Sequence, residues 1–287
     1  MADIMQPTAS IFQKKLIREV ISLALREDIG QGDVTSHWIL RKDLIIKGRI
    51  VAHEEGVIAG LQIASQVFLT VDKHTRFINK VKDGSTVLKG TVVAIVGGPA
   101  VSILSAERTA LNFLQRMSGI ATMTRQLVQK IRKTKARILD TRKTAPGLRS
   151  IDKLAVYMGG GQNHRFGLYD MVLIKDNHIK SAGSISRAIQ LIQKRNHQRI
   201  KVEVEVENLT QLKEVLSEKI DIIMLDNMSF IEIKKAVAIV NGKFKLEVSG
   251  GINNSNILQI AQTGVDYISI GGLTHSVKAL DLSLDIL

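Results

Sequence analysis

The sequence predicts an α/β protein whose main domain is an incomplete parallel α/β barrel of about six to seven strands. From Ala136 onward a short apolar strand is followed by a helix, and this unit recurs along the chain. Strands that alternate with helices favour parallel pairing through right-handed crossovers. Every expected strand also ends in polar or glycine-rich residues, as strands of parallel barrels do at their catalytic face. The expected strands are residues 136–142, 169–176, 201–207, 221–227, 244–251 and 266–272.

An open, doubly wound sheet is the alternative architecture for the same repeat. The turn after the first strand lacks the G-x-G-x-x-G pattern of dinucleotide-binding sheets. That kind of sheet is therefore not favoured, and the barrel is the preferred interpretation.

The residues before the repeat predict a smaller domain of mixed helices and strands, with expected bounds 1–115. Apolar residues at helical spacing predict a helix over 11–27, for which Ser10 is the candidate N-cap. Residues 27–36 are rich in Gly, Asp and Ser and predict a loop. The other expected elements are strands over 44–52, 57–59 and 77–81, a helix over 61–71, and helices over 103–117 and 120–133 separated by Gly119.

Composition excludes several classes of protein. The chain has no cysteine, which excludes disulfides, cysteine-ligated zinc and thiol catalysis. No apolar run approaches the roughly 18–20 residues of a membrane helix. The first ten residues lack the pattern of a signal peptide. We therefore expect a cytoplasmic protein.

The net charge of +13 is unevenly distributed, with +3 in residues 1–115 and +10 in 116–287. An excess of this size attracts anions, which include phosphorylated small molecules, nucleic acids and acidic surfaces. Residues 125–137 form a basic run, which we expect to be a solvated helix face. The alternative, a nucleic-acid-binding patch, lacks the interleaved aromatic residues that single-strand binding favours.

Residues 139–178, which run from one expected strand end to another, are rich in cationic and imidazole side chains. The barrel interpretation puts those ends on adjacent strands at the catalytic face, where five of these side chains would form an anion-binding site. The stretch between them contains the glycine triplet 159–161. The side chains are those of Arg142, Lys143, His164, Arg165 and Lys175.

In residues 201–207, valines alternate strictly with glutamates from Val202 to Glu207. The outer face of a barrel strand packs against helices, so the valines should face outward and Glu203 and Glu205 should point inward. Asp226 ends the next strand. Magnesium favours one or two carboxylates together with substrate phosphate oxygens, so Glu205 and Asp226 are the candidate Mg²⁺ ligands.

Glycines end the last two expected strands. Ser249, Gly250 and Gly251 end one, and Gly271 and Gly272 end the other. Glycines allow backbone N–H groups to approach a phosphate closely, and late barrel strands often hold a phosphate in this way. The residues therefore predict a cationic pocket, a pair of carboxylates and a phosphate site, and hence an anionic, partly phosphorylated substrate.

Several motifs resemble the quinolinate phosphoribosyltransferase family, also called nicotinate-nucleotide pyrophosphorylase (carboxylating). They include EDIGQGDVTS, ERTALNFLQRMSGIAT, DTRKTAPGLR and GGGQNHRFGLYDMVLIKDNH, and they run in order over nearly the whole chain. The resemblance implies an N-terminal α/β sandwich over 1–115, to which a tail over 274–287 returns. It also implies an incomplete α/β barrel over 116–273.

The resemblance further implies a reaction, in which phosphoribosyl pyrophosphate and quinolinate give nicotinate mononucleotide, pyrophosphate and CO₂ in NAD biosynthesis. It implies Mg²⁺ as the cofactor and a homodimer or higher oligomer. A related pyrophosphorylase-like protein associated with molybdate transport is the closest alternative.

Site roles follow from the same resemblance. Arg142, His164 and Arg165 would hold the two carboxylates of quinolinate, and Arg108 would reach into the site of a partner subunit. Lys143 and Lys175 would contact the anionic substrates. Glu205 and Asp226 would serve the ribose hydroxyls and Mg²⁺-pyrophosphate. The 5-phosphate would lie on Ser249, Gly250, Gly251, Gly271 and Gly272.

Overall fold

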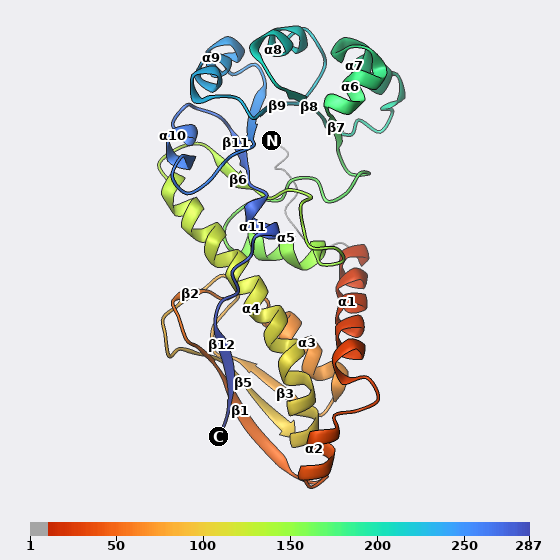
Figure 1. Cartoon of the computed structure of the whole chain (residues 1–287), viewed down its shortest axis with the longest axis vertical. Helices are drawn as coiled ribbons and strands as arrows, with labels where there is room; N and C mark the ends of the chain where they lie inside the picture. Colours follow the sequence, from red (N-terminus) through yellow and green to blue (C-terminus); the bar gives the residue numbers. More distant parts are fainter. Residues whose placement is uncertain (1–10) are drawn as a thin grey trace. The chain divides into compact units, whose positions relative to one another are not determined.

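The computed structural model describes residues 11–287, with side chains from Lys14 onward. The chain forms two compact units (Figure 1). The first contains 1–125, 143–160 and 272–287, and the second contains 126–142 and 161–271. No helix in the described part of the chain is long and apolar enough to cross a membrane.

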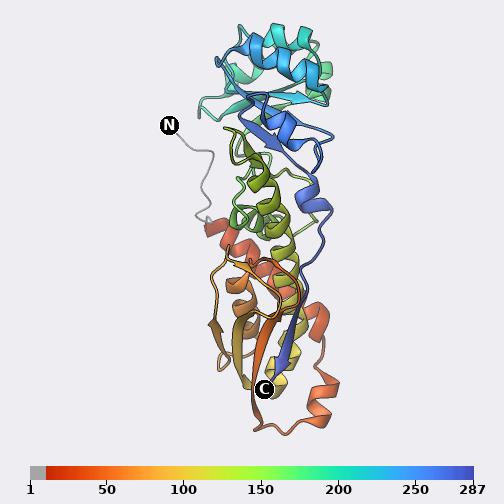
Figure 2. The same ribbon diagram turned by 90° about the vertical axis from the view of Figure 1, so that its left-hand side faces the viewer.

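The first unit is built on a four-stranded antiparallel sheet in the order β12-β1-β5-β3. Its C-terminal strand pairs with the first strand, so that Leu282 lies opposite Ala52 (Figure 2). These strands are β1 (Ile45–Ala52), β3 (Arg76–Asn79), β5 (Val92–Pro99) and β12 (Leu282–Ile286), and a separate pair comprises β2 (Gly56–Val57) and β4 (Thr86–Val87). The helices are α1 (Ile11–Ile29), α2 (Val34–Ile39), α3 (Leu61–Val71), α4 (Ala100–Ile131), α5 (Arg149–Met158) and α11 (Gly272–His275).

The second unit is a six-stranded parallel sheet with helices between its strands, which confirms the predicted parallel α/β architecture. The strand order is β6-β11-β10-β9-β8-β7. The strands are β6 (Arg137–Leu139), β7 (Val172–Ile174), β8 (Val202–Val206), β9 (Ile222–Asp226), β10 (Lys245–Ser249) and β11 (Tyr267–Ser269). The helices are α6 (Asp176–Ala182), α7 (Ile185–Arg195), α8 (Leu209–Val215), α9 (Phe230–Val240) and α10 (Ile257–Ala261).

The sheet of the second unit does not close, because β6 and β7 lie at its opposite edges. The expectation that these two strands are adjacent was therefore wrong. Gln162 bridges to Leu139 on β6 and exchanges backbone hydrogen bonds with Ile138 and Asp140. A segment of irregular chain thus pairs with β6, and the same segment continues directly into Asn163 and His164.

Residues 100–131 form one continuous helix, α4, where two helices separated by Gly119 were expected. The glycine serves close packing within the first unit. A Cβ atom at position 119 would lie 2.0 Å from the carbonyl oxygen of Lys278. Absence of a side chain here lets the C-terminal segment contact the helix, while the helical hydrogen bonds continue.

The predicted loop over 27–36 is shorter than expected. Helix α1 continues to Ile29, and α2 begins at Val34. Asp33 is the N-cap of α2, and its side chain accepts the Ser36 N–H at 2.9 Å. Such a cap satisfies a backbone donor that has no partner within the helix. Ser10, the candidate cap of the first helix, lies outside the described residues.

Capping side chains also start three helices of the second unit. Ser184 accepts the Arg187 N–H at the start of α7, and Asn208 accepts two N–H groups at the start of α8. Ser229 and Glu232 form a reciprocal capping box at the start of α9. Helices α8 and α9 therefore begin shortly after the carboxyl ends of β8 and β9, which leaves those strand ends available for polar side chains.

Candidate functional site

Most predicted site residues of the second unit lie at or just beyond the carboxyl ends of its parallel strands. The neighbouring strands β8, β9 and β10 pair in register, so that Glu205 lies opposite Met224, and Ser249 lies opposite Asp226. Parallel strands bring their carboxyl ends to one edge of the sheet. The residues at these ends are Arg142 after β6, Lys175 after β7, Glu205 on β8, Asp226 on β9, Ser249 on β10 and Gly271 after β11.

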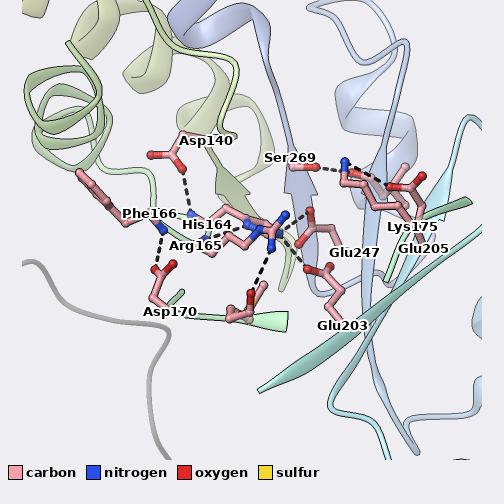
Figure 3. A network of polar contacts seen from close by, with 12 residues as sticks. Asp140, His164, Arg165, Phe166, Asp170, Lys175, Glu203, Glu205, Glu247 and Ser269 are labelled. Carbon is pink, nitrogen blue, oxygen red and sulfur yellow. Dashed lines mark hydrogen bonds and ion pairs between the residues drawn. The ribbon is translucent and has the colours of Figure 1, made fainter. Parts of the chain in front are cut away.

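The loop that carries His164 and Arg165 is held by two carboxylates. Asp140 is fully buried, and it accepts the His164 N–H at 2.9 Å and a hydrogen bond from the Asn163 side chain. Asp170 accepts backbone N–H groups at the other end of the loop (Figure 3). Sequence reasoning treated Asp140 only as part of a polar strand end. Its role depends on residues more than twenty positions away, which no local pattern shows.

Arg165 is buried, with 8% of its surface exposed. Its Nη1 donates to the Met171 carbonyl at 3.1 Å, while its Nε has no hydrogen-bond partner within residues 11–287. Burial lowers the pKa of Arg165, and the positive charge of Arg142 lowers it further. Two guanidinium groups close enough to repel each other at a buried position create a strong preference for an anion.

A buried cluster formed by His164, Glu203 and Glu247 lies beside this arginine (Figure 3). His164 Nε2 lies 2.9 Å from Glu203 Oε2 and 3.7 Å from Glu247 Oε1. Both glutamates are fully buried, which confirms that Glu203 points inward. Glu247 was missed by sequence reasoning, although residues 245–249 show the same alternation of apolar and polar residues that identified Glu203.

Burial strongly perturbs the two carboxyl groups of this cluster. Burial raises the pKa of each glutamate to about 8, and the ionised Glu203 adds to the effect on Glu247. Glu203 Oε1 and both carboxyl oxygens of Glu247 accept no hydrogen bond from any other described group. Two carboxylates cannot donate to each other, so a proton held between them satisfies these oxygens and lowers the cost of burying the charge.

Glu205, Lys175 and Asp226 form a second polar group in the same unit. Lys175 Nζ lies 3.7 Å from Glu205 Oε2. Burial raises the pKa of Glu205; Lys175 opposes this shift, and the negative charge of Asp226 contributes to it. Asn227 Nδ2 donates to Asp226 Oδ2 at 2.8 Å. Two mutually repelling carboxylates at neighbouring strand ends have the oxygen chemistry of a Mg²⁺ site, so these residues fit the ion.

Backbone conformation at the end of β10 requires glycine. Gly250 has φ +91°, and a Cβ atom there would lie 2.0 Å from Asn227 Oδ1. Gly251 has φ +63° and open space where a side chain would be. These two glycines line a pocket together with Asn227, Phe230 and Asn256. A pocket with an exposed, glycine-rich backbone beside the carboxylate pair suits a phosphate group.

Three predicted site residues belong to the first unit. The Lys143 carbonyl accepts a hydrogen bond from Thr274 Oγ1 at 2.9 Å, and Gly272 begins α11. Arg108 is exposed on α4. The structure therefore places these residues in a compact unit that does not contain His164 or Glu205, although Lys143 and Gly272 directly follow Arg142 and Gly271 in the chain.

The basic run 125–137 is mainly a solvated surface. Arg125 is half-buried, and its Nε donates to the Gly159 carbonyl at 2.9 Å. This arginine thus has a structural role in the first unit. The exposed members of the run are Lys130, Arg132, Lys133, Lys135 and Arg137.

Two family models match the chain. The quinolinate phosphoribosyl transferase N-terminal domain matches residues 33–118, and the C-terminal domain of the same family matches residues 120–285. Together they cover most of the sequence.

Curated relatives agree with these matches. The chain is 45% identical over 289 residues to "quinolinate phosphoribosyltransferase [decarboxylating] 2b, mitochondrial" of Nicotiana tabacum, covering 94% of this chain and 82% of that protein. It is 43% identical to "probable nicotinate-nucleotide pyrophosphorylase [carboxylating]" of Bacillus subtilis, covering 94% and 93% of the two chains.

Solved structures give the same result. The nicotinate-nucleotide pyrophosphorylase from Francisella tularensis superposes with a TM-score of 0.91 at 42% identity, covering 95% of this chain and 96% of that chain. The corresponding protein from Ehrlichia chaffeensis has a TM-score of 0.90 at 46% identity, with coverage of 94% and 98%.

Proposed function

The chain belongs to the quinolinate phosphoribosyltransferase family, and from that premise we propose how its own residues perform the family's reaction. The protein is a pentosyltransferase that transfers a phosphoribosyl group from phosphoribosyl pyrophosphate to quinolinate with decarboxylation. The reaction produces nicotinate mononucleotide, pyrophosphate and CO₂, and so serves the biosynthesis of NAD.

The observation that carries this proposal is the pair of guanidinium groups of Arg142 and Arg165. Each repels the other enough to lower the pKa of Arg165, so an anion with two carboxylates relieves the repulsion. Arginine can bind a carboxylate through two parallel N–H groups, which also orients the pyridine ring. We assign the dicarboxylate of quinolinate to these arginines, with Lys143 and Lys175 contributing positive charge towards both substrates.

Phosphoribosyl pyrophosphate occupies the other part of the proposed site. Its 5-phosphate is assigned to the glycine-rich backbone at Ser249, Gly250, Gly251, Gly271 and Gly272. Glu205 and Asp226 are assigned to the ribose hydroxyls and to Mg²⁺. When bound, Mg²⁺ would neutralise negative charge on the pyrophosphate leaving group. The support for this assignment is the carboxylate pair itself: burial raises the pKa of Glu205, and the negative charge of Asp226 adds to this rise.

The main task of these residues is to position two anions that repel each other. The quinolinate nitrogen forms a bond to C1 of the ribose, and the bond from C1 to the pyrophosphate oxygen breaks. The bond between the ring and the adjacent carboxylate then breaks and releases CO₂. Its electron pair stays on the ring carbon, where the cationic ring nitrogen stabilises it until a proton is added. The cationic side chains act by electrostatic stabilisation, and the route needs no covalent enzyme intermediate.

We further propose a homodimer in which Arg108 enters the site of the partner subunit. The exposed position of this cationic side chain on α4 supports the assignment. We also propose a cytoplasmic location. Curated plant relatives are named mitochondrial or chloroplastic, so the compartment varies within the family.

Two alternatives are not favoured. The family models and relatives are named for quinolinate phosphoribosyl transfer, which argues against a protein associated with molybdate transport. A nucleic-acid-binding protein would use the basic run 125–137, and that run includes a half-buried arginine bonded to the backbone.

The decisive experiment supplies Mg²⁺, phosphoribosyl pyrophosphate and either quinolinate or nicotinate, and measures CO₂ and pyrophosphate together. We expect equal amounts of both products with quinolinate and neither with nicotinate. Pyrophosphate release without CO₂, or turnover of nicotinate, would contradict the proposed function. Retention on DNA or RNA at low salt would instead support the nucleic-acid alternative.

A further inference from the structure

Glu203 and Glu247 have no role in the chemistry proposed above, yet both are fully buried in the second unit. Burying a carboxyl group is costly unless hydrogen bonds compensate for lost solvation. The two groups lie next to His164, whose neighbour Arg165 is one of the two dicarboxylate anchors. Their position suggests a function in holding that anchor.

The imidazole of His164 is held at both of its nitrogen atoms. The Arg165 backbone N–H donates to Nδ1 at 2.8 Å, so Nδ1 is the unprotonated nitrogen. The ring proton is therefore on Nε2, which lies 2.9 Å from Glu203 Oε2 and donates to it. With both nitrogens engaged inside the protein, the ring of His164 is in a position to act on its neighbour Arg165.

This arrangement controls the orientation of Arg165. Its backbone N–H is bonded to the His164 ring, and its Nη1 is bonded to the Met171 carbonyl. Arg165 is thus fixed once at its backbone and once at its guanidinium group, while Nε has no protein partner among the described residues. Fixing a guanidinium in advance reduces the entropy lost when it binds a carboxylate.

We propose that Glu203 and Glu247 are positioning residues: buried together beside His164, they hold its imidazole, which in turn orients Arg165 for the dicarboxylate of the substrate. Glu203 makes the direct contact with the ring. Glu247 Oε1 lies 3.7 Å from the same ring nitrogen and contributes a second carboxyl group beside it. The inference rests on the proposed function, because it concerns affinity for quinolinate.

A divalent cation between the three side chains is the competing explanation. The ligand atoms lie within 4.8 Å of one another, which permits an ion. However, Nε2 and Glu203 Oε2 are already at direct hydrogen-bond distance, so this contact forms without an ion between the two atoms. The two explanations differ in what a glutamine does, since an amide replaces a hydrogen-bonded carboxyl group well and a metal ligand poorly.

The test compares Glu247→Gln with Glu247→Leu in the full-length enzyme. We expect the glutamine variant to keep its KM for quinolinate within about threefold of wild type, because the amide can donate to Glu203. The leucine variant should raise this KM by about tenfold or more, as expected for loss of a charge-assisted hydrogen bond. The KM for phosphoribosyl pyrophosphate should change by less than about twofold in both.

Asp266→Asn is the matched control. This carboxylate bonds Lys245 and the Leu246 N–H at the amino end of the same sheet, away from the strand ends that carry the site. The substitution should lower thermal stability without changing either KM. Thermal unfolding of every variant separates loss of folding from loss of positioning.

Each result decides the matter. An unchanged quinolinate KM in Glu247→Leu, or a parallel rise in the KM values of both substrates, overturns the inference. Equal impairment of the glutamine and leucine variants, reversed by added Mn²⁺ or Zn²⁺, overturns it in favour of an ion. Absence of wild-type turnover overturns the proposed function and this inference together, whereas normal wild-type turnover with an unaffected leucine variant overturns the inference alone.

Discussion

Lys175 Nζ lies 3.7 Å from Glu205 Oε2, across the carboxyl ends of the neighbouring parallel strands β7 and β8. The lysine opposes the rise in the pKa of Glu205 that burial and Asp226 cause. This contact favours the ionised form of Glu205, which is the form that can serve as an oxygen ligand for a metal ion. The strand pairing therefore places a cation beside the proposed metal site, where it can also contact the pyrophosphate.

Glu205→Gln and Asp226→Asn should each raise the Mg²⁺ concentration needed for half-maximal activity by about tenfold or more. A neutral amide is a weaker ligand for a hard cation than a carboxylate. The measurement is activity against Mg²⁺ concentration at saturating substrates. Glu207→Gln is the control, because Glu207 is exposed just beyond the same strand. An unchanged Mg²⁺ dependence in both site variants would refute the metal assignment.

Arg165→Ala should lower kcat/KM for quinolinate by about 100-fold or more, since it removes a buried, preoriented cation that binds an anionic substrate. Arg165→Lys should recover little, because lysine cannot make the bidentate contact. Steady-state kinetics with quinolinate checks both. Arg187→Ala, on the exposed face of α7, removes the same charge and should leave kinetics unchanged. Near-normal turnover by Arg165→Ala would remove Arg165 from the site.

Gly250→Ala should raise the KM for phosphoribosyl pyrophosphate by about tenfold or more. The added Cβ would collide with the Asn227 side chain, and φ +91° is strained for alanine. The backbone that is proposed to hold the 5-phosphate must then shift. Gly242 also has positive φ, at +76°, but a Cβ atom added there would meet no atom within 4 Å. Gly242→Ala should therefore affect only stability. Equal KM values for phosphoribosyl pyrophosphate in Gly250→Ala and Gly242→Ala would argue against a phosphate at Gly250.

Arg108→Ala and Arg142→Ala should each be nearly inactive alone, yet active when mixed. If Arg108 completes the partner's site, a mixed dimer has one intact site. Random exchange of subunits would then restore about a quarter of wild-type activity. The assay mixes the two variants after reversible dissociation and follows CO₂ release. Activity that stays at the level of the separate variants would contradict a shared site.

The strand ends could be predicted because short apolar strands and helices alternate from Ala136 onward. The inward position of Glu203 could be predicted because this residue alternates with valines. Physical reasoning about an outward apolar face was enough to place Glu203 inside. The same argument applied to Leu246 and Val248 would have found Glu247. These features depend on neighbours within a few residues.

Other features depend on distant parts of the chain and could not be predicted from local pattern. Gly119 permits close approach of Lys278, although a glycine within a helical pattern equally suggests a break. Gln162 takes the edge of β6, which keeps the sheet open between β6 and β7. Asp140 orders the His164 loop through a backbone hydrogen bond across more than twenty residues.

Stability should depend on pH through Glu247. Burial raises the pKa of this carboxyl group to about 8, whereas its ordinary value is 4.5. Between these values the folded protein holds a proton that the unfolded chain has lost, so the free energy of unfolding falls as pH rises. The slope is at most about 1.4 kcal/mol per pH unit for each proton retained.

Glu247→Gln removes this titration, and the variant should gain stability relative to wild type as pH rises from 5 to 8. Urea unfolding at pH 5, 6.5 and 8 measures the difference in the free energy of unfolding. Asp266→Asn serves again as the control and should show no such gain, because Lys245 and Lys135 hold the pKa of Asp266 below its ordinary value against the effect of burial. A stability difference between Glu247→Gln and wild type that is constant from pH 5 to 8 would mean that Glu247 is ionised in the folded protein throughout this range. The proton of the carboxyl pair would then be on Glu203, whose pKa burial also raises to about 8.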